Sequence, residues 1–212
     1  LGDVYKRQVL ALPAAVGLLV LSQPIISTLF ERGAFSPTAV DATAQTLFCY
    51  AFGLPAFIII KVLQPSFFAR YDTLTPVKVA SFMVLTNLVL NIILMQYLAH
   101  AGLALATSIT AWLNAAILTF ILKQKGLHQH SKETYVKLVR TFMASAVMGM
   151  GLLGLIEFVG DSMFDPKNPN ILSLTALILL GLFLYIIQVF LFRVIRLSEV
   201  RQEIKSWVKN NQ

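Results

Sequence analysis

Hydrophobic runs separated by short polar segments make up most of the chain, and the longest of them, residues 79–122, contains no Asp, Glu, Lys or Arg. A soluble domain does not hide so long an uncharged run, whereas one crossing of a bilayer takes about 20 apolar residues. The run is therefore long enough to cross a membrane twice. We place a reversal at residues 99–102, which predicts a hairpin of two helices at 79–98 and 102–122.

The other hydrophobic runs predict four further membrane helices, at 9–30, 42–68, 138–158 and 171–192. Pro55 lies inside the second of these and predicts a kink after Gly53 and Leu54, because proline removes a backbone donor. The predicted fold class is therefore all-α and integral to the membrane, with six transmembrane helices.

Polar residues mark the remaining segments. Residues 1–8 are polar and mixed in charge, and we interpret them as a truncation edge or a scar. Residues 123–137 predict a basic loop between a four-helix part, 9–122, and the final two helices, 138–192. Residues 193–212 carry Ile, Val and Trp along one side, which predicts a short amphipathic helix on the membrane surface.

The composition agrees with a membrane protein. The mean hydropathy is +0.75 and 13% of residues are charged, against about a quarter in soluble domains. In a soluble protein the net charge of +7 would favour nucleic-acid binding. Here the charges lie in loops, so we interpret them as topology signals that face membrane lipid, and we expect no nucleic acid as a partner. The single cysteine, Cys49, excludes an internal disulfide and a Cys-based metal cluster.

The distribution of positive charge predicts the orientation. With six helices, 15 Lys and Arg residues fall on one side of the membrane and only Arg32 and Lys167 on the other. Because cytoplasmic loops carry an excess of Lys and Arg, we place both ends of the chain, the turn at 69–78 and the 123–137 loop in the cytoplasm. The segments expected to face outward are 31–37, 96–101 and 160–170.

The sequence contains no catalytic constellation. The three histidines, His100, His128 and His130, fall in predicted loops and have no metal-ligand spacing with Cys, Asp or Glu. There is no Walker motif and no Gly-rich nucleotide loop. We therefore predict that the protein is not an enzyme, has no cofactor and is not an ATP-driven pump.

A few polar side chains lie within the predicted hairpin. Asn87 and Asn91 are four residues apart and share one helix face, and Thr107 and Asn114 are seven apart and share another. Their oxygens would suit a small cation or line a polar path, and the other interpretation is hydrogen bonding between the two helices. Both interpretations stay open at this stage. Polar side chains within the two predicted arms include Asn87, Asn91, Thr107, Ser108, Thr110 and Asn114.

Charged residues near the predicted 69–78 turn form a second candidate site. Lys61 and Arg70 could bind an anionic headgroup, although snorkelling of Lys61 to the inner interface explains its position equally well. We group these two residues with Asn114 as substrate-binding or cavity residues. Asp72 is expected to pair with Arg70 or Lys78 across the turn. Structural or gating roles are assigned to residues at helix ends, kinks and turns: Arg32, Gly33, Pro55, Asp72, Thr75 and Pro76.

Five short motifs follow one another in a fixed order: 29–35 (LFERGAF), 50–57 (YAFGLPAF), 61–63 (KVL), 67–78 (FFARYDTLTPVK) and 102–108 (GLALATS). In these motifs and in its helix spacing the chain resembles the bacterial MurJ/MviN proteins, the lipid II flippases of peptidoglycan synthesis. The resemblance is specific across residues 9–122, and residues 123–212 match only in hydropathy.

The resemblance implies a fourteen-helix fold of the multidrug/oligosaccharidyl-lipid/polysaccharide exporter superfamily. This chain would then supply the last six helices, and the missing N-terminal helices of the same protein would be its partner. The final two helices would border a groove for a polyprenyl tail. The resemblance also implies a sodium site, which some family members form from this hairpin and an earlier helix, and Asn87, Asn91 and Thr107 would be the matching positions. One of these is acidic in such members, whereas this chain has Asn91, which lowers the charge of the site.

The expected function is to move lipid II, a disaccharide-peptide linked through pyrophosphate to a polyprenyl chain, across the bacterial inner membrane by alternating access. Sodium or the membrane potential would drive it. One alternative is an exporter of the same superfamily for other lipid-linked polysaccharides or for drugs. Another is a membrane scaffold that transports nothing. Replacing Asn87 and Thr107 by leucine separates the classes, because only a transporter should be impaired.

Overall fold

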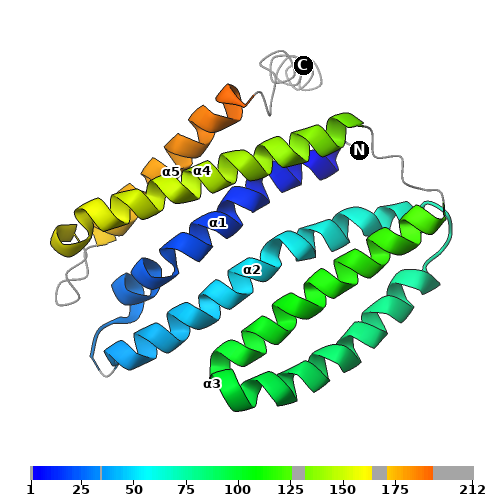
Figure 1. Ribbon diagram of the computed structural model, residues 1–212, viewed down its shortest axis with the longest axis horizontal. Helices are drawn as coiled ribbons and strands as arrows, with labels where there is room; N and C mark the ends of the chain where they lie inside the picture. The colour runs from blue at the N-terminus through cyan, green and yellow to red at the C-terminus, as the bar shows by residue number, and fades with distance from the viewer. Residues whose placement is uncertain (1, 34, 126–131, 164–170, 193–212) are drawn as a thin grey trace, which may run out of the picture.

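The computed structural model describes residues 2–33, 35–125, 132–163 and 171–192, and every regular element within these ranges is an α-helix (Figure 1). All five helices contain a stretch that is long and apolar enough to cross a membrane. They are α1 (Gly2–Phe30), α2 (Pro37–Phe68), α3 (Leu74–Gln124), α4 (Lys132–Met163) and α5 (Ile171–Leu191). The predicted class, an all-helical membrane protein, is confirmed.

The longest element, α3, consists of two helical arms. A straight helix of its 51 residues would be about 75 Å long, more than twice the ~30 Å hydrocarbon core of a bilayer. Helical geometry breaks at Ala99, where φ is 47° and ψ is −124°, and Figure 1 shows that α3 folds back on itself. We call residues 74–98 the first arm and residues 100–124 the second arm. The break lies within the segment 99–102 where the sequence predicts the reversal.

The first two helices begin earlier than hydropathy predicts. α1 begins at Gly2 rather than at residue 9, and α2 begins at Pro37 rather than at residue 42. Hydropathy detects only the apolar part of a helix, whereas a polar cap sets where the helix begins. At α2, Ser36 Oγ accepts a hydrogen bond from the backbone N–H of Ala39 at 3.3 Å, and Pro37 occupies the first turn.

The bounds of the last two helices also differ from the prediction. α4 is longer than the predicted 138–158, because residues 132–137 and 160–163, which were expected in loops, are helical. These turns are polar and carry no hydropathy signal. α5 ends at Leu191, one residue before the predicted end. The predicted amphipathic tail, 193–212, lies outside the described residues.

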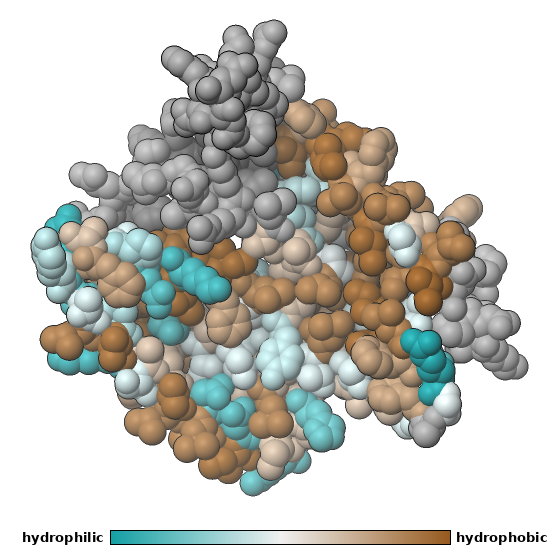
Figure 2. Space-filling view, turned by 180° about the vertical axis from the view of Figure 1, so that it is seen from behind, coloured by the Kyte–Doolittle hydropathy of each residue, from teal (hydrophilic) through white to brown (hydrophobic). Residues whose placement is uncertain are grey.

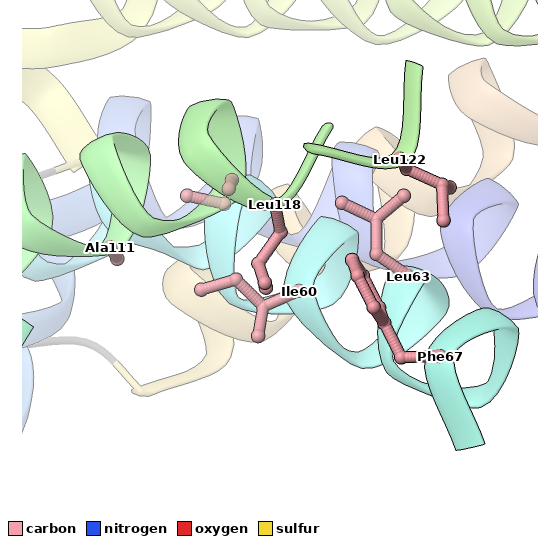
Figure 3. Close-up of a cluster of buried hydrophobic side chains, with 8 residues drawn as sticks. Ile60, Leu63, Phe67, Ala111, Leu118 and Leu122 are labelled. Carbon is pink, nitrogen blue, oxygen red and sulfur yellow. The ribbon is translucent and has the colours of Figure 1, made fainter. Parts of the chain in front are cut away.

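Three clusters of buried apolar side chains hold the helices together. One joins α1, α4 and α5, one joins α2 to the second arm of α3, and one joins the end of α1 to the start of α2. Figure 3 shows the α2 and α3 side chains of the second cluster pointing toward one another. The clusters are Leu21, Ala144, Met148, Leu152, Leu177, Tyr185 and Val189; Ala56, Ile60, Leu63, Phe67, Ala111, Ala115, Leu118 and Leu122; and Ile26, Val40 and Ala44.

Large hydrophobic side chains also cover much of the outside. On the first arm of α3, Phe82, Val84 and Leu85 each expose about two thirds of their surface. Figure 2 shows the same character on one face, where hydrophobic residues predominate among those coloured and hydrophilic ones form small groups. Exposed apolar surface of this extent suits contact with lipid rather than water.

Candidate functional site

A chain of side-chain hydrogen bonds joins the two arms of α3. Asn91 Nδ2 donates to Asn87 Oδ1 at 2.9 Å, and Asn87 Nδ2 donates to Thr110 Oγ1 at 3.1 Å. Thr110 Oγ1 in turn donates to the backbone oxygen of Ala106 at 2.7 Å. Asn87 and Asn91 therefore share a face, as their spacing predicts, and this face meets the second arm.

A pocket of about 280 Å³ opens beside this chain, between the hairpin and α2. The polar part of its wall consists of Asn87, Thr107, Thr110 and Asn114, and the rest is apolar. Asn114 Oδ1 is buried and has no hydrogen-bond partner among the described residues, and the same holds for Oδ1 of the neighbouring Asn91. Buried acceptors without donors mark a place for water or for a ligand that donates hydrogen bonds.

The second arm is also bonded to α2, which forms the opposite wall of the pocket. Ser108 Oγ donates to the backbone oxygen of Cys49 at 2.5 Å, and Trp112 Nε1 donates to that of Phe52 at 3.0 Å. Gly53 permits this close approach, because a Cβ added there would lie 2.5 Å from Ser108 Oγ. These contacts fix the distance between the two walls.

The predicted site residues do not all come together. Asn114, Asn87 and Thr107 line one pocket, whereas Lys61 and Arg70 are exposed and do not line it. Within the part of the chain that the structure describes, neither cation forms an ion pair. The polar residues of the hairpin and the two cations therefore form separate groups. Their positions in the sequence alone could not show this separation.

The sequence interpretation named Thr110 among the polar residues of the hairpin but did not assign it to the candidate site, although Thr110 accepts the hydrogen bond between the arms. A signal was present, because Thr110 is three residues after Thr107 and four before Asn114 and therefore shares their face. Thr107 itself donates to the backbone oxygen of Leu103 at 2.9 Å, within its own arm. Across the described ranges, no three His, Cys, Asp or Glu side chains are grouped so that they could hold a metal ion.

The turn between α2 and α3 ends α2 in a Schellman motif. The backbone N–H of Asp72 donates to Phe67 O at 3.1 Å, and that of Tyr71 donates to Phe68 O at 3.0 Å. Tyr71 has a φ of 58° and occupies the left-handed position that glycine usually fills. This conformation strains the backbone of any residue that has a Cβ. Because the Tyr71 side chain is 97% exposed, its burial contributes no stabilisation that would offset this strain.

Replacing Tyr71 by glycine is expected to raise the stability of the intact protein by roughly 0.5–1 kcal/mol. The left-handed conformation costs about 1–2 kcal/mol for a residue with a Cβ, and the greater backbone entropy of unfolded glycine cancels part of the gain. Thermal unfolding in detergent measures the effect. Tyr97→Gly is the control, since Tyr97 is also exposed but lies inside a helix, and it should lower Tm. A lower Tm for Tyr71→Gly would contradict the strain argument.

Asp72 joins this turn to the far end of α3. Its carboxylate accepts hydrogen bonds from Thr75 N at 3.1 Å and Thr75 Oγ1 at 2.8 Å, and it forms an ion pair with Lys125. The expected partners were Arg70 and Lys78, and this prediction is wrong. Lys125 follows the second arm directly, and the reversal of α3 returns that arm to the turn.

The ion pair predicts a specific pH dependence. The hydrogen bond from Lys125, with those from Thr75, lowers the pKa of Asp72 from 3.8 to about 2. Because the folded pKa is the lower one, the stabilisation from Asp72 is complete above about pH 4 and is lost as the pH falls through 2. Thermal unfolding is measured for the wild type and for Asp72→Asn from pH 6 to pH 2. The Tm of the wild type should exceed that of the variant by a constant amount down to about pH 4, and the difference should then shrink as the pH approaches 2. Asparagine retains a cap acceptor but does not ionise. A gap that persists unchanged at pH 2 would exclude this role of Asp72.

Other residues assigned structural or gating roles make structural contacts. Arg32 Nη2 donates to the backbone oxygen of Leu29 at 2.7 Å, which satisfies a carbonyl at the end of α1. Gly33 has a φ of 63°, a conformation that favours glycine. Pro76 is buried in the first turn of the first arm. α2 continues through the half-buried Pro55, so the predicted kink does not interrupt the helix. A gating role for these residues stays a prediction.

A second pocket, of about 300 Å³, lies between α1, α4 and α5 and is almost entirely apolar. Its wall includes Leu18, Leu152 and Leu182, one from each helix, and Gly17 and Gly181 leave room between the larger side chains. A cavity with so apolar a wall suits a hydrocarbon chain rather than a headgroup.

Comparisons with known proteins agree with one another. A sequence model described as lipid II flippase MurJ matches residues 6–174. A probable lipid II flippase MurJ of Vibrio cholerae is 36% identical over 192 residues, which are 91% of this chain and 36% of that protein. One of Rickettsia prowazekii is 44% identical over 120 residues, which are 56% of this chain and 24% of that protein. A solved structure of lipid II flippase MurJ in an inward closed conformation is similar, with a TM-score of 0.72 and 27% identity, over 90% of this chain and 38% of that one. The chain thus spans well under half the length of these relatives.

Proposed function

Because the chain belongs to the lipid II flippase MurJ family, we propose that it is part of a protein that moves lipid II across the bacterial inner membrane. The family match over residues 6–174 carries this proposal. The fold supports it, since each of the five described helices contains a stretch that is long and apolar enough to cross a membrane. The product would be lipid II exposed on the outer face for cell-wall synthesis.

The proposal includes an architecture. With the two arms of α3 counted separately, the chain has six crossings and both of its ends in the cytoplasm. These six would be the last of fourteen, and the preceding helices of the same protein would complete the transport path. The chain covers 38% of the similar solved structure, a share close to six helices of fourteen. Transport would follow alternating access, in which one bundle rocks against another.

The two pockets would serve different parts of the substrate. The apolar pocket between α1, α4 and α5 would hold part of the polyprenyl tail, because its wall is hydrocarbon. The exposed Lys61 and Arg70 would contact the pyrophosphate. Asn114, whose buried oxygen lacks a donor, would accept a hydrogen bond from the headgroup or from water that accompanies it.

The membrane potential is better supported than sodium as the driving force. The described hairpin pocket contains amides and hydroxyls but no carboxylate, so it attracts a cation weakly. Asn87 Oδ1, at one of the positions proposed for sodium, already accepts a hydrogen bond from Asn91. When an anionic headgroup moves outward across an inside-negative membrane, its free energy falls by about 2.3 kcal/mol per charge per 100 mV.

Complementation tests the proposal. The intact gene that encodes this chain is expressed in a bacterium depleted of its own lipid II flippase, and growth and outer-face lipid II are measured. We expect growth to be restored and lipid II to reach the outer face. Failure of both, with the protein present in the membrane at normal amounts, would overturn the proposal.

A double variant separates transport from a scaffold role. Asn87→Leu with Thr107→Leu removes the bond between the arms and half of the polar wall. Loss of the hydrogen bond between the arms, worth ~0.6–2 kcal/mol, together with loss of half of the polar wall should lower the rate of lipid II appearance by roughly tenfold. The control is Thr86→Leu with Thr119→Leu, because these two residues lie on the same arms but do not line the pocket, and their hydroxyls donate to carbonyls of their own helix. Equal rates for the two variants would favour the scaffold.

A further inference from the structure

The wall of the hairpin pocket contains amides and hydroxyls but no charge. Its polar members are two amides, Asn87 and Asn114, and two hydroxyls, Thr107 and Thr110. None of the described residues that line it is Asp, Glu, Lys, Arg or His. Phosphate groups bind most strongly where cationic side chains donate to them. The pocket therefore suits a neutral part of a lipid headgroup rather than its phosphates.

Hydrogen bonds within the wall leave the Asn114 oxygen free to accept. Asn87 Oδ1 accepts from Asn91, and Asn87 Nδ2 donates to Thr110. The hydroxyls of Thr107 and Thr110 donate to backbone oxygens of their own arm. Asn114 Oδ1, in contrast, is buried and has no partner among the described residues. Because an unpaired buried acceptor costs free energy, a ligand that brings an O–H or N–H group is favoured here.

An aromatic ring forms part of the opposite wall. Phe57 of α2 lines the pocket, and 39% of its surface is exposed. The face of an aromatic ring is partly negative and attracts groups that are partly positive. A sugar ring has such C–H groups on its faces and hydroxyls around its edge. An aromatic ring and an amide oxygen in one pocket therefore match both kinds of group on a sugar.

A cation lies one helical turn from this aromatic ring. Lys61 follows Phe57 by four residues on α2, so the two share a helix face at a rise of about 6 Å. Lys61 is exposed and does not line the pocket. In a sugar that is linked to a polyprenyl chain through pyrophosphate, the ring is bonded directly to a phosphate. A ring against Phe57 therefore brings its phosphate toward Lys61.

We propose that the hairpin pocket is a sugar subsite, in which the ring next to the pyrophosphate lies against Phe57 and donates a hydrogen bond to Asn114 Oδ1. Lys61 holds the adjacent phosphate outside the pocket. Phe57 and Asn114 are then the residues that distinguish a sugar-bearing lipid from one without a sugar. The subsite rests on the proposed function, because the sugar belongs to the lipid-linked substrate named there.

Two lipids that share the tail and the pyrophosphate isolate the contribution of the sugar. Binding of lipid II and of polyprenyl pyrophosphate is measured with the intact protein in lipid nanodiscs. Asn114→Leu and Phe57→Leu should each weaken the binding of lipid II by roughly fivefold, the effect of one lost hydrogen bond or contact, and leave polyprenyl pyrophosphate binding unchanged. Lys61→Gln should weaken both lipids by a similar factor, and unchanged binding in Lys61→Gln would overturn this arrangement of sugar and phosphate.

Matched variants lie on the second arm outside the pocket. Phe120→Leu removes an exposed aromatic ring, and Thr119→Leu replaces a polar side chain by the same leucine as Asn114→Leu. Both should bind the two lipids as the wild type does. Equal weakening of both lipids in Asn114→Leu and Phe57→Leu, or no weakening of either lipid, would overturn the subsite. If Asn114→Leu does not reach the membrane, Phe57→Leu decides.

A soluble probe separates the subsite from the proposed function. Saturation transfer from the protein to a free disaccharide of N-acetylhexosamines is recorded in nanodiscs without glycoside detergent. We expect a signal with the wild type that both pocket variants lose and both second-arm variants keep. A signal that is equal in all of them would count against the subsite. If the wild type binds the disaccharide but neither binds nor transports lipid II, the proposed function fails and the sugar site stands.

Discussion

Replacing Gly102 by alanine is expected to destabilise the intact protein by about 3 kcal/mol, the upper end of the usual cost of overpacking. A Cβ at this position would lie 2.4 Å from the backbone oxygen of Leu94 and 2.6 Å from its carbonyl carbon. Backbone atoms cannot rotate away as a side-chain end can. The two arms would have to separate at the reversal, which would weaken the hydrogen bond from Asn87 to Thr110 as well.

Gly154 provides the control for this substitution. It lies in α4, and nothing is within 4 Å of an added Cβ. Gly154→Ala should therefore leave Tm unchanged or raise it slightly, since alanine favours a helix by up to about 1 kcal/mol over glycine. Thermal unfolding of both variants in the same detergent gives the comparison. Similar Tm values for Gly102→Ala and Gly154→Ala would show that the hairpin is not as tight as described.

Replacing Phe67 by alanine is expected to cost about 3–5 kcal/mol, the range for a buried aromatic side chain in a packed core. Phe67 is 1% exposed and packs among apolar side chains of α2 and the second arm (Figure 3). Within a membrane, association between helices depends on van der Waals packing of this kind, because lipid is as apolar as the side chains. The loss of Phe67 would also remove support from the turn that holds Asp72.

Phe82 offers a matched control on the first arm. Its side chain is 61% exposed, so Phe82→Ala removes the same ring from the lipid-facing surface without leaving an internal cavity. We expect its Tm to stay within a few degrees of the wild type, while that of Phe67→Ala falls strongly. If the two variants melt together, the α2–α3 cluster does not contribute to stability as its burial suggests.

Hydropathy and turn chemistry predict much of this fold. The uncharged run and its break near residues 99–102 are sufficient to place the hairpin, because 44 uncharged and mostly apolar residues are too many for one crossing. The spacing of Asn87 and Asn91 predicts a shared face, and the structure adds the hydrogen bond between them. These features depend on local periodicity, which a single sequence contains.

Contacts between distant residues were not predictable in the same way. The choice of Arg70 or Lys78 for Asp72 assumed a local pair, whereas the actual partner, Lys125, depends on how the second arm packs. The helix starts at Gly2 and Lys132 were missed because polar turns outside the membrane carry no hydropathy signal.

The reversal of α3 also bears on how the protein is made. No charge interrupts the chain between Lys78 and Lys123, and the tip at 99–102 contains only His100 as an ionisable residue. In the predicted orientation, Lys78 and Lys123 keep both ends of the hairpin in the cytoplasm, where the chain is synthesised. The tip carries no permanent charge, so its passage through the bilayer does not require a charge to be stripped of water. The two arms can leave the insertion machinery as a closed pair, with Asn87 and Thr110 already bonded to each other rather than exposed to lipid.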